Sequence, residues 1–146
     1  MSDDRIFVDT NVLVYAYDTD AGEKHQTAGT VLMNLWESQR GAISTQVLQE
    51  FYVTVTRKVP KPLARRAARE VVDTYRAWPV HQPAVDDVIA ASEVEERYQL
   101  SFWDALLIVS ARRSDARTVL SEDFQDGRRI GELVISNPFA PSKRER

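Results

Sequence analysis

Ile6-Phe7-Val8-Asp9 sets three consecutive apolar residues directly before an aspartate. The β-branched and aromatic side chains of this run favour a short strand that is buried on both faces. Asp9 then stands at the carboxyl end of that strand. Ligands of open parallel sheets bind outside the carboxyl ends of the strands, so Asp9 is a candidate site residue.

Further short apolar runs alternate with segments of helical periodicity. Strands are also predicted at residues 42–44, 80–82, 118–120 and 133–135. Helices are predicted at 11–17, 23–39, 45 to the break at Pro60 and Pro62, 63–77, 84–98 and 102–113, with Gly41 ending the second. This alternation implies βαβ units and an α/β fold with a largely parallel sheet covered on both faces.

The pattern also predicts buried helix faces. In the helix over 63–77 the expected buried residues are Ala64, Ala67, Ala68, Val71, Val72 and Tyr75. In the helix over 84–98 they are Val85, Val88, Ile89, Ser92 and Val94. Residues 121–131 are predicted to form a loop, because they are polar and rich in turn-forming residues.

Length and composition set the class of protein. The 146 residues fit one domain, expected at 1–139, followed by a polar, basic tail at 140–146. The absence of cysteine excludes thiolate zinc sites and cysteine nucleophiles. No apolar run approaches the roughly 20 residues that span a bilayer, and the polar N-terminus is unlike a secretory signal. We therefore expect a cytoplasmic protein without a membrane partner.

A net charge of −3 and a pI of about 5.4 argue at first sight against a polyanionic partner. The distribution of charge matters more when a site is itself built from acids. Basic residues gather in four short groups: 57, 58 and 61; 65, 66 and 69; 112, 113 and 117; and 128 and 129. Each group either lines a rim around an acidic centre or belongs to a solvated helix face.

Four acids are predicted to lie at or near one edge of the sheet: Asp9, Glu50, Asp104 and Asp123. Each also has a structural interpretation. Asp9 could cap the following helix, and Glu50 could be a solvated helix residue. Asp104 fits a capping box with Ser101. Asp123, like Asp126, could be a turn former.

Taken together, the structural interpretations weaken. Carboxylates that converge on one edge repel one another and raise each other's pKa, and a divalent cation removes that cost. Oxygen-only ligands favour Mg²⁺ or Mn²⁺ over zinc. His25 and His81 have no ligand spacing and are expected to be ordinary surface or packing residues.

At these residues the sequence resembles the PIN-domain nucleases and, among them, the VapC-type toxins of toxin–antitoxin pairs. The resemblance covers about residues 5–139 in the family's order and spacing. Its segments are Phe7-Val8-Asp9-Thr10-Asn11-Val12-Leu13-Val14-Tyr15-Ala16, Ser44-Thr45-Gln46-Val47-Leu48-Gln49-Glu50-Phe51-Tyr52, Ser101-Phe102-Trp103-Asp104-Ala105-Leu106-Leu107 and Leu120-Ser121-Glu122-Asp123-Phe124-Gln125-Asp126-Gly127.

The resemblance implies a three-layer α/β/α fold around a mostly parallel sheet of about five strands. It also implies an acidic pocket in which Asp9 and Asp104 bind one or two Mg²⁺ or Mn²⁺ ions directly. Glu50 and Asp123 would complete the site directly or through water. Asn11 would orient the first carboxylate, Ser121 matches a hydroxyl position near the fourth acid, and Asp126 could share or replace the role of Asp123.

The implied activity is hydrolysis of phosphodiester bonds in single-stranded or looped RNA, with the metal activating water and stabilising the leaving oxygen. The expected partners are RNA, a small antitoxin and a second copy of the chain. The dimer would form through apolar surfaces around Phe51, Tyr52, Trp78 and Trp103. These residues could instead fill the core. Two alternatives stay open: a PIN nuclease of RNA processing, and a catalytically silent RNA- or protein-binding module. A HAD-like phosphatase is discounted, because Asn11 stands where a second aspartate would be needed.

Overall fold

The computed structural model describes residues 4–141, so most of the predicted tail lies outside the described residues. Its sheet has the strand order β3-β2-β1-β4-β6-β5. All neighbouring strands are parallel except β5 and β6. The strands are β1 (Arg5–Val8), β2 (Gly41–Ser44), β3 (Val80–His81), β4 (Ala116–Leu120), β5 (Arg129–Ile130) and β6 (Leu133–Ser136). β5 lies inside the segment predicted to be a loop, which makes the sheet one strand larger than expected.

Helices connect β1 to β2, β2 to β3 and β3 to β4. They are α1 (Thr10–Tyr15), α2 (Glu23–Ser38), α3 (Thr45–Arg57), α4 (Arg65–Thr74), the short 3-10 helix η1 (Tyr75–Ala77), α5 (Val85–Tyr98) and α6 (Phe102–Arg113). The predicted α/β class with a mostly parallel central sheet is confirmed. The helix predicted over residues 63–77 is in fact α4 followed by η1.

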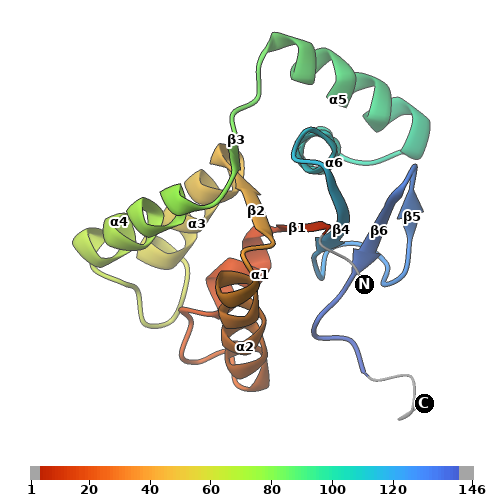
Figure 1. The fold of residues 1–146 in the computed structure, drawn as a ribbon. Helices are drawn as coiled ribbons and strands as arrows, with labels where there is room; N and C mark the ends of the chain where they lie inside the picture. Colours follow the sequence, from red (N-terminus) through yellow and green to blue (C-terminus); the bar gives the residue numbers. More distant parts are fainter. Residues whose placement is uncertain (1–3, 142–146) are drawn as a thin grey trace.

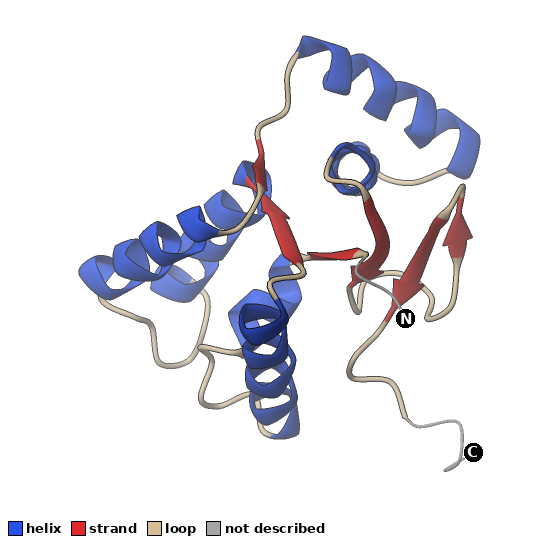
Figure 2. Ribbon diagram, viewed as in Figure 1, coloured by secondary structure: helices blue, strands red, loops and turns tan. Residues whose placement is uncertain are grey.

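The helices lie on both sides of the sheet, as the three-layer prediction requires (Figures 1 and 2). β1, β2 and β3 follow one another in one direction along the sheet, and the chain then returns to β4 on the other side of β1. Right-handed crossovers therefore put α1 to α4 on one face and α5 and α6 on the opposite face. The packing agrees, since α3 contacts α1 and α4, whereas α5 contacts α6.

The reversal of direction between β1 and β4 is the topological switch point of the sheet. Val8 pairs with Leu120 in the register of these strands, so the next residues, Asp9 and Ser121, are neighbours. Crevices at switch points are the places where open α/β sheets bind ligands. The fold thus brings Asp9 and the segment after β4 together at the expected place.

Two local predictions are wrong for packing reasons. Gly41 does not end α2, because Gln39 caps that helix in the left-handed conformation. Gly41 instead opens β2, where the Trp78 ring lies only 2.5 Å from the position a Cβ atom would take. In α4 the predicted residues Ala64 and Ala67 are exposed, and the buried side is formed by Ala68 with partly buried Val71 and Val72.

The buried face of α5 was predicted correctly only at Val94. Val85, Val88 and Ile89 are 75%, 47% and 57% exposed. The face toward α6 carries Val94 together with Asp87 and Ala91, which were not predicted, and Ser92 is exposed. α5 therefore presents apolar side chains to solvent and buries a carboxylate.

The residues proposed for a dimer surface separate in the structure. Phe51 and Trp78 belong to the core, with 0% and 6% exposure, and Tyr52 packs partly against it. Trp103 is 62% exposed. Of the helices within residues 4–141, none has the length and apolar character needed to cross a membrane.

Candidate functional site

Asp9 is held at the switch point by neutral hydrogen-bond donors. Its Oδ1 accepts the Thr10 amide at 2.6 Å, which makes Asp9 the N-cap of α1. Its Oδ2 accepts the Ser121 hydroxyl at 2.6 Å and the Asn11 side-chain amide at 3.3 Å. Its backbone amide also donates to the Leu120 carbonyl at 2.9 Å. The capping interpretation is therefore correct, but capping occupies only one of the two carboxylate oxygens.

Asn11 joins Asp9 to the segment after β4. Its side-chain amide donates to Asp123 Oδ2 at 3.1 Å, and its Oδ1 accepts the Glu122 amide at 3.3 Å. The Ser121 hydroxyl in turn accepts the Asp123 amide at 3.0 Å. Two short polar side chains thus hold Asp9 and Asp123 at one edge of the sheet, although 114 positions separate these two acids in the sequence.

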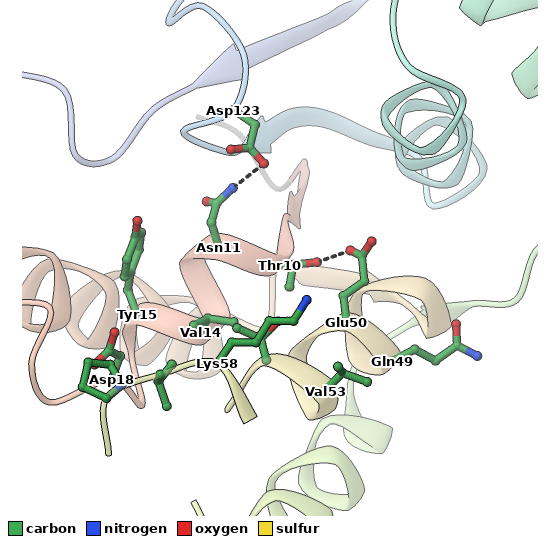
Figure 3. A pocket seen from close by; sticks show the side chains of 13 residues that line it. Thr10, Asn11, Val14, Tyr15, Asp18, Gln49, Glu50, Val53, Lys58 and Asp123 are labelled. Atoms are coloured by element: carbon green, nitrogen blue, oxygen red, sulfur yellow. Dashed lines mark hydrogen bonds between the residues drawn. The ribbon is translucent and has the colours of Figure 1, made fainter. Parts of the chain in front are cut away.

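Glu50 reaches the same edge from α3. Its Oε1 accepts the Thr10 hydroxyl at 2.7 Å (Figure 3). The contact depends on the packing of α1 against α3. Glu50 is exposed, and Thr10 orients its carboxylate toward the site.

Asp104 is the third residue of α6 and is partly buried. The Ser101 hydroxyl accepts its amide at 3.1 Å, so one half of the predicted capping box is present, but among the described residues no hydrogen bond runs from the Ser101 amide back to the Asp104 carboxylate. Gln46 in α3 donates to the Trp103 carbonyl at 3.3 Å and ties the start of α6 to α3. Burial raises the pKa of Asp104, and the charges of Asp123 and Glu50 raise it further, against a lowering effect of Ser101.

The pKa of Asp9 is shifted by burial and by the neighbouring acids. Burial raises its pKa to about 7, although hydrogen bonds from Ser121 and Thr10 lower it. The charges of Asp123 and Glu50 raise it further. The charges of Asp123 and Glu50 thus raise the pKa values of both Asp9 and Asp104. The structure brings all four predicted acids to one edge of the sheet.

Comparison with protein families gives a match to the PIN domain over residues 6–132. The chain belongs to the PIN domain family. A comparison of the sequence with curated proteins finds no match.

Solved structures with the same PIN domain fold come from several toxin–antitoxin systems. A toxin–antitoxin complex from Klebsiella pneumoniae has 17% identity and a TM-score of 0.69, covering 92% of this chain and 98% of that one. VapC20 from Mycobacterium tuberculosis, a toxin described as cleaving the sarcin-ricin loop, has 24% identity and a TM-score of 0.63, with coverage of 81% and 91%. VapBC2 from Rickettsia felis, bound to a promoter DNA fragment, has 19% identity and a TM-score of 0.63, with coverage of 90% and 97%.

The donor set of this PIN domain fits a hard divalent cation, because every candidate ligand is an oxygen. Within residues 4–141, however, no three or more acidic or histidine side chains form a ready metal-binding cluster. The amide group of Asn11 lies between Asp9 and Asp123 and contacts both. Direct coordination by both acids would require this amide to turn aside. The four acids, with Asp9 buried among them, fit a cation. In this conformation the Asn11 amide group donates hydrogen bonds to two of these carboxylates.

A hollow of about 680 Å³ opens beside the acids (Figure 3). At one end it is lined by Thr10, Asn11, Glu50 and Asp123, and further along by the apolar side chains of Val14, Val53 and Val59. Of all the predicted basic groups, one member alone lines this hollow, namely Lys58. The predicted basic rim is therefore reduced here to one ammonium group.

The remaining predicted site residues have separate roles. Asp126 accepts the Asn137 amide at 2.8 Å, and the charges that raise the pKa values of Asp9 and Asp104 are those of Asp123 and Glu50. His25 contacts the Tyr15 carbonyl, and His81 contacts Ser110. Thr10 was missed as a site residue; its place directly after Asp9 was the available signal.

Proposed function

We propose that this PIN domain is a Mg²⁺- or Mn²⁺-dependent endoribonuclease that hydrolyses single-stranded or looped RNA, as the toxin of a VapBC-type pair. The observation that carries the proposal is the gathering of Glu50, Asp104 and Asp123 near the buried Asp9, whose donors are all neutral. A toxin that cleaves cellular RNA would act in the cytoplasm.

Each side chain has a defined part in the proposed reaction. Asp9 and Asp104 would bind the cation directly, and Glu50 and Asp123 would complete its coordination directly or through water. One or two bound cations would lower the pKa of the attacking water and offset charge on the leaving oxygen. The Ser121 hydroxyl and the Thr10 amide fix the orientation of Asp9. The Thr10 hydroxyl does the same for Glu50.

The proposed protein partners are an antitoxin and a second copy of the chain. Support for the antitoxin comes from the similar folds found in toxin–antitoxin complexes of Klebsiella pneumoniae and Rickettsia felis. Support for a dimer comes from the solvent-facing apolar side of α5, formed by Val85, Val88 and Ile89. An apolar patch of this kind is typical of an interaction surface.

The enzymatic part is tested with purified protein and a labelled single-stranded RNA. Cleavage should require Mg²⁺ or Mn²⁺ and stop in EDTA. Asp9→Asn and Asp104→Asn should each lower the rate by at least about 100-fold while the fold is retained. Asp86→Asn, an exposed acid on α5, is the matched control and should stay within about twofold of wild type. Equal cleavage by wild type and both site variants would refute the assignment.

The toxin assignment needs a separate test in cells. Expression of the wild-type chain should arrest growth, and Asp9→Asn should abolish the arrest. Co-expression of a short reading frame found next to the gene should restore growth to the wild-type strain. Normal growth with an enzyme that is active in vitro would instead favour a nuclease of RNA processing.

A further inference from the structure

The hollow beside the acids has features that hydrolysis alone does not require. Coordination of a cation and attack on a phosphodiester need oxygen ligands and a water molecule. They do not need the apolar wall that Val14, Val53 and Val59 provide. Nor do they need Lys58, which extends into the hollow with its ammonium group toward the side of Thr10 and Glu50 (Figure 3).

Lys58 differs from the other basic residues near this face. Lys61 forms an ion pair with Asp20 at 3.6 Å. Arg57 belongs to the last turn of α3 and does not line the hollow. Lys58 follows that helix as its C-cap, and none of the ion pairs between described residues includes it. Its charge is thus available to an anion that enters the hollow.

The other charged side chains that line the hollow are Asp18, Glu50 and Asp123. Among the charged side chains that line the hollow, Lys58 is therefore the one that attracts a polyanion. An unpaired nucleotide matches both features of the hollow, because its phosphate takes a cation and its base takes an apolar wall. A volume of about 680 Å³ is also in the range of small-molecule sites.

We infer that Lys58 binds the phosphate next to the scissile one in single-stranded RNA, while the base between them lies against Val14, Val53 and Val59. This rests on the proposed function and specifies how the substrate is held. Lys58 is a binding residue in this assignment and takes no part in the chemical step. Its contribution is therefore expected in KM and in the salt dependence, with kcat preserved.

Steady-state cleavage of one labelled RNA oligonucleotide tests the inference, with wild type, Lys58→Ala, Lys58→Arg and Lys61→Ala measured side by side. Lys58→Ala should raise KM about tenfold, the size expected for a lost charge-assisted hydrogen bond. Its plot of log kcat/KM against log salt should be less steep by about 0.7, the value for one phosphate contact on a single strand. Lys58→Arg should restore most of both, and Lys61→Ala should match wild type.

The outcomes separate the two proposals. No cleavage by wild type in Mg²⁺ or Mn²⁺ would overturn the nuclease function, and this inference with it. Cleavage by wild type with an unchanged KM and salt slope in Lys58→Ala would overturn the inference alone. A fall in kcat at constant KM would also overturn it, because Lys58 would then act on the chemical step. Thermal unfolding of each variant confirms that the compared proteins are folded.

Discussion

Asp9 and Asp87 are both buried, with 4% and 5% exposure, yet their surroundings differ in charge. Asp87 accepts the Ala84 amide at 2.8 Å, pairs with Arg113 at 2.7 Å and lies 3.2 Å from His81. These contacts hold its pKa below the usual range, with the Ala84 hydrogen bond contributing most. Burial raises the pKa of Asp9 to about 7, and the charges of Asp123 and Glu50 add to the rise, since the neutral donors to Asp9 lower its pKa only in part.

The difference lies in where the compensating cation comes from. Burial of a carboxylate is costly unless a positive charge or several hydrogen bonds offset it. For Asp87 the chain itself supplies Arg113, which joins α5 to α6. For Asp9 the hydrogen bonds offset only part of the cost. We interpret Asp87 as a structural carboxylate and Asp9 as a ligand of the proposed divalent cation.

The largest expected effect on stability comes from breaking the Asp87 contacts. Asp87→Asn removes the charge that Arg113 and His81 face inside the α5–α6 contact. We expect a loss of about 2 kcal/mol in the free energy of unfolding, below the usual cost of breaking a buried pair because Arg113 is 51% exposed. Urea unfolding measures it. A loss below about 0.5 kcal/mol, the range of surface substitutions, would remove the structural interpretation.

Unlike Asp87→Asn, Asp9→Asn should raise the free energy of unfolding at neutral to alkaline pH. The pKa of Asp9 is about 7 in the folded protein, against about 4 for an unfolded chain. The folded state thus holds the proton more tightly, and the stability contributed by this carboxyl is lost as the pH rises from about 4 to about 7. The shift sets an upper limit of about 4 kcal/mol on that loss. Asparagine avoids ionisation but offers one acceptor oxygen where the aspartate has two.

We therefore expect Asp9→Asn to raise the free energy of unfolding by about 1 to 2 kcal/mol at pH 8 in EDTA. The gain should vanish near pH 4.5, where the wild-type carboxyl is protonated in the folded state. Urea unfolding at both pH values provides the measurement. If Asp9→Asn is less stable than wild type at both, the charge of Asp9 is already compensated within the chain.

Added Mg²⁺ should sharpen the comparison. A ligand at ten times its dissociation constant stabilises the folded state by about 1.4 kcal/mol. Wild type and Asp87→Asn should show the same Mg²⁺-dependent gain, and Asp9→Asn should show none. The gain should shrink below about pH 7, because protons compete with the cation for Asp9. Equal stabilisation of all three proteins would mean that Mg²⁺ binds elsewhere.

The two aspartates also differ in how far the sequence could predict them. Asp9 follows an apolar strand, and the position of Asp123 after another such strand predicts their meeting through topology alone. Asp87 was missed, because helical periodicity assigned the buried side of α5 to Val85, Val88 and Ile89. Burial of Asp87 depends on Arg113, 26 positions away, and no local pattern carries that information.

Besides the burial of Asp87, the sequence could not predict the side-chain contacts between different helices. Thr10 and Glu50 meet only because α1 packs on α3, and Lys58 enters the hollow only because α3 ends beside it. A largely parallel sheet and the four candidate acids follow from patterns along the chain and from the family resemblance, whereas the strand order was not predicted. Which of the basic residues faces the acids depends on helix rotation, which periodicity does not fix at an exposed helix end.

The smallest expected effects define the boundary of the site in the segment after β4. Asp123 contacts Asn11, whereas Asp126 contacts the Asn137 amide beyond β6. Asp126→Ala should cost about 0.5 kcal/mol of stability for one exposed hydrogen bond and leave kcat/KM within about twofold of wild type. Asp123→Ala should lower the Mg²⁺-dependent kcat/KM at least about tenfold. The reverse pattern would move the fourth acid to Asp126. Asn11 would then bridge Asp9 to a carboxylate outside the reaction, and the spacing of the acids would need another explanation.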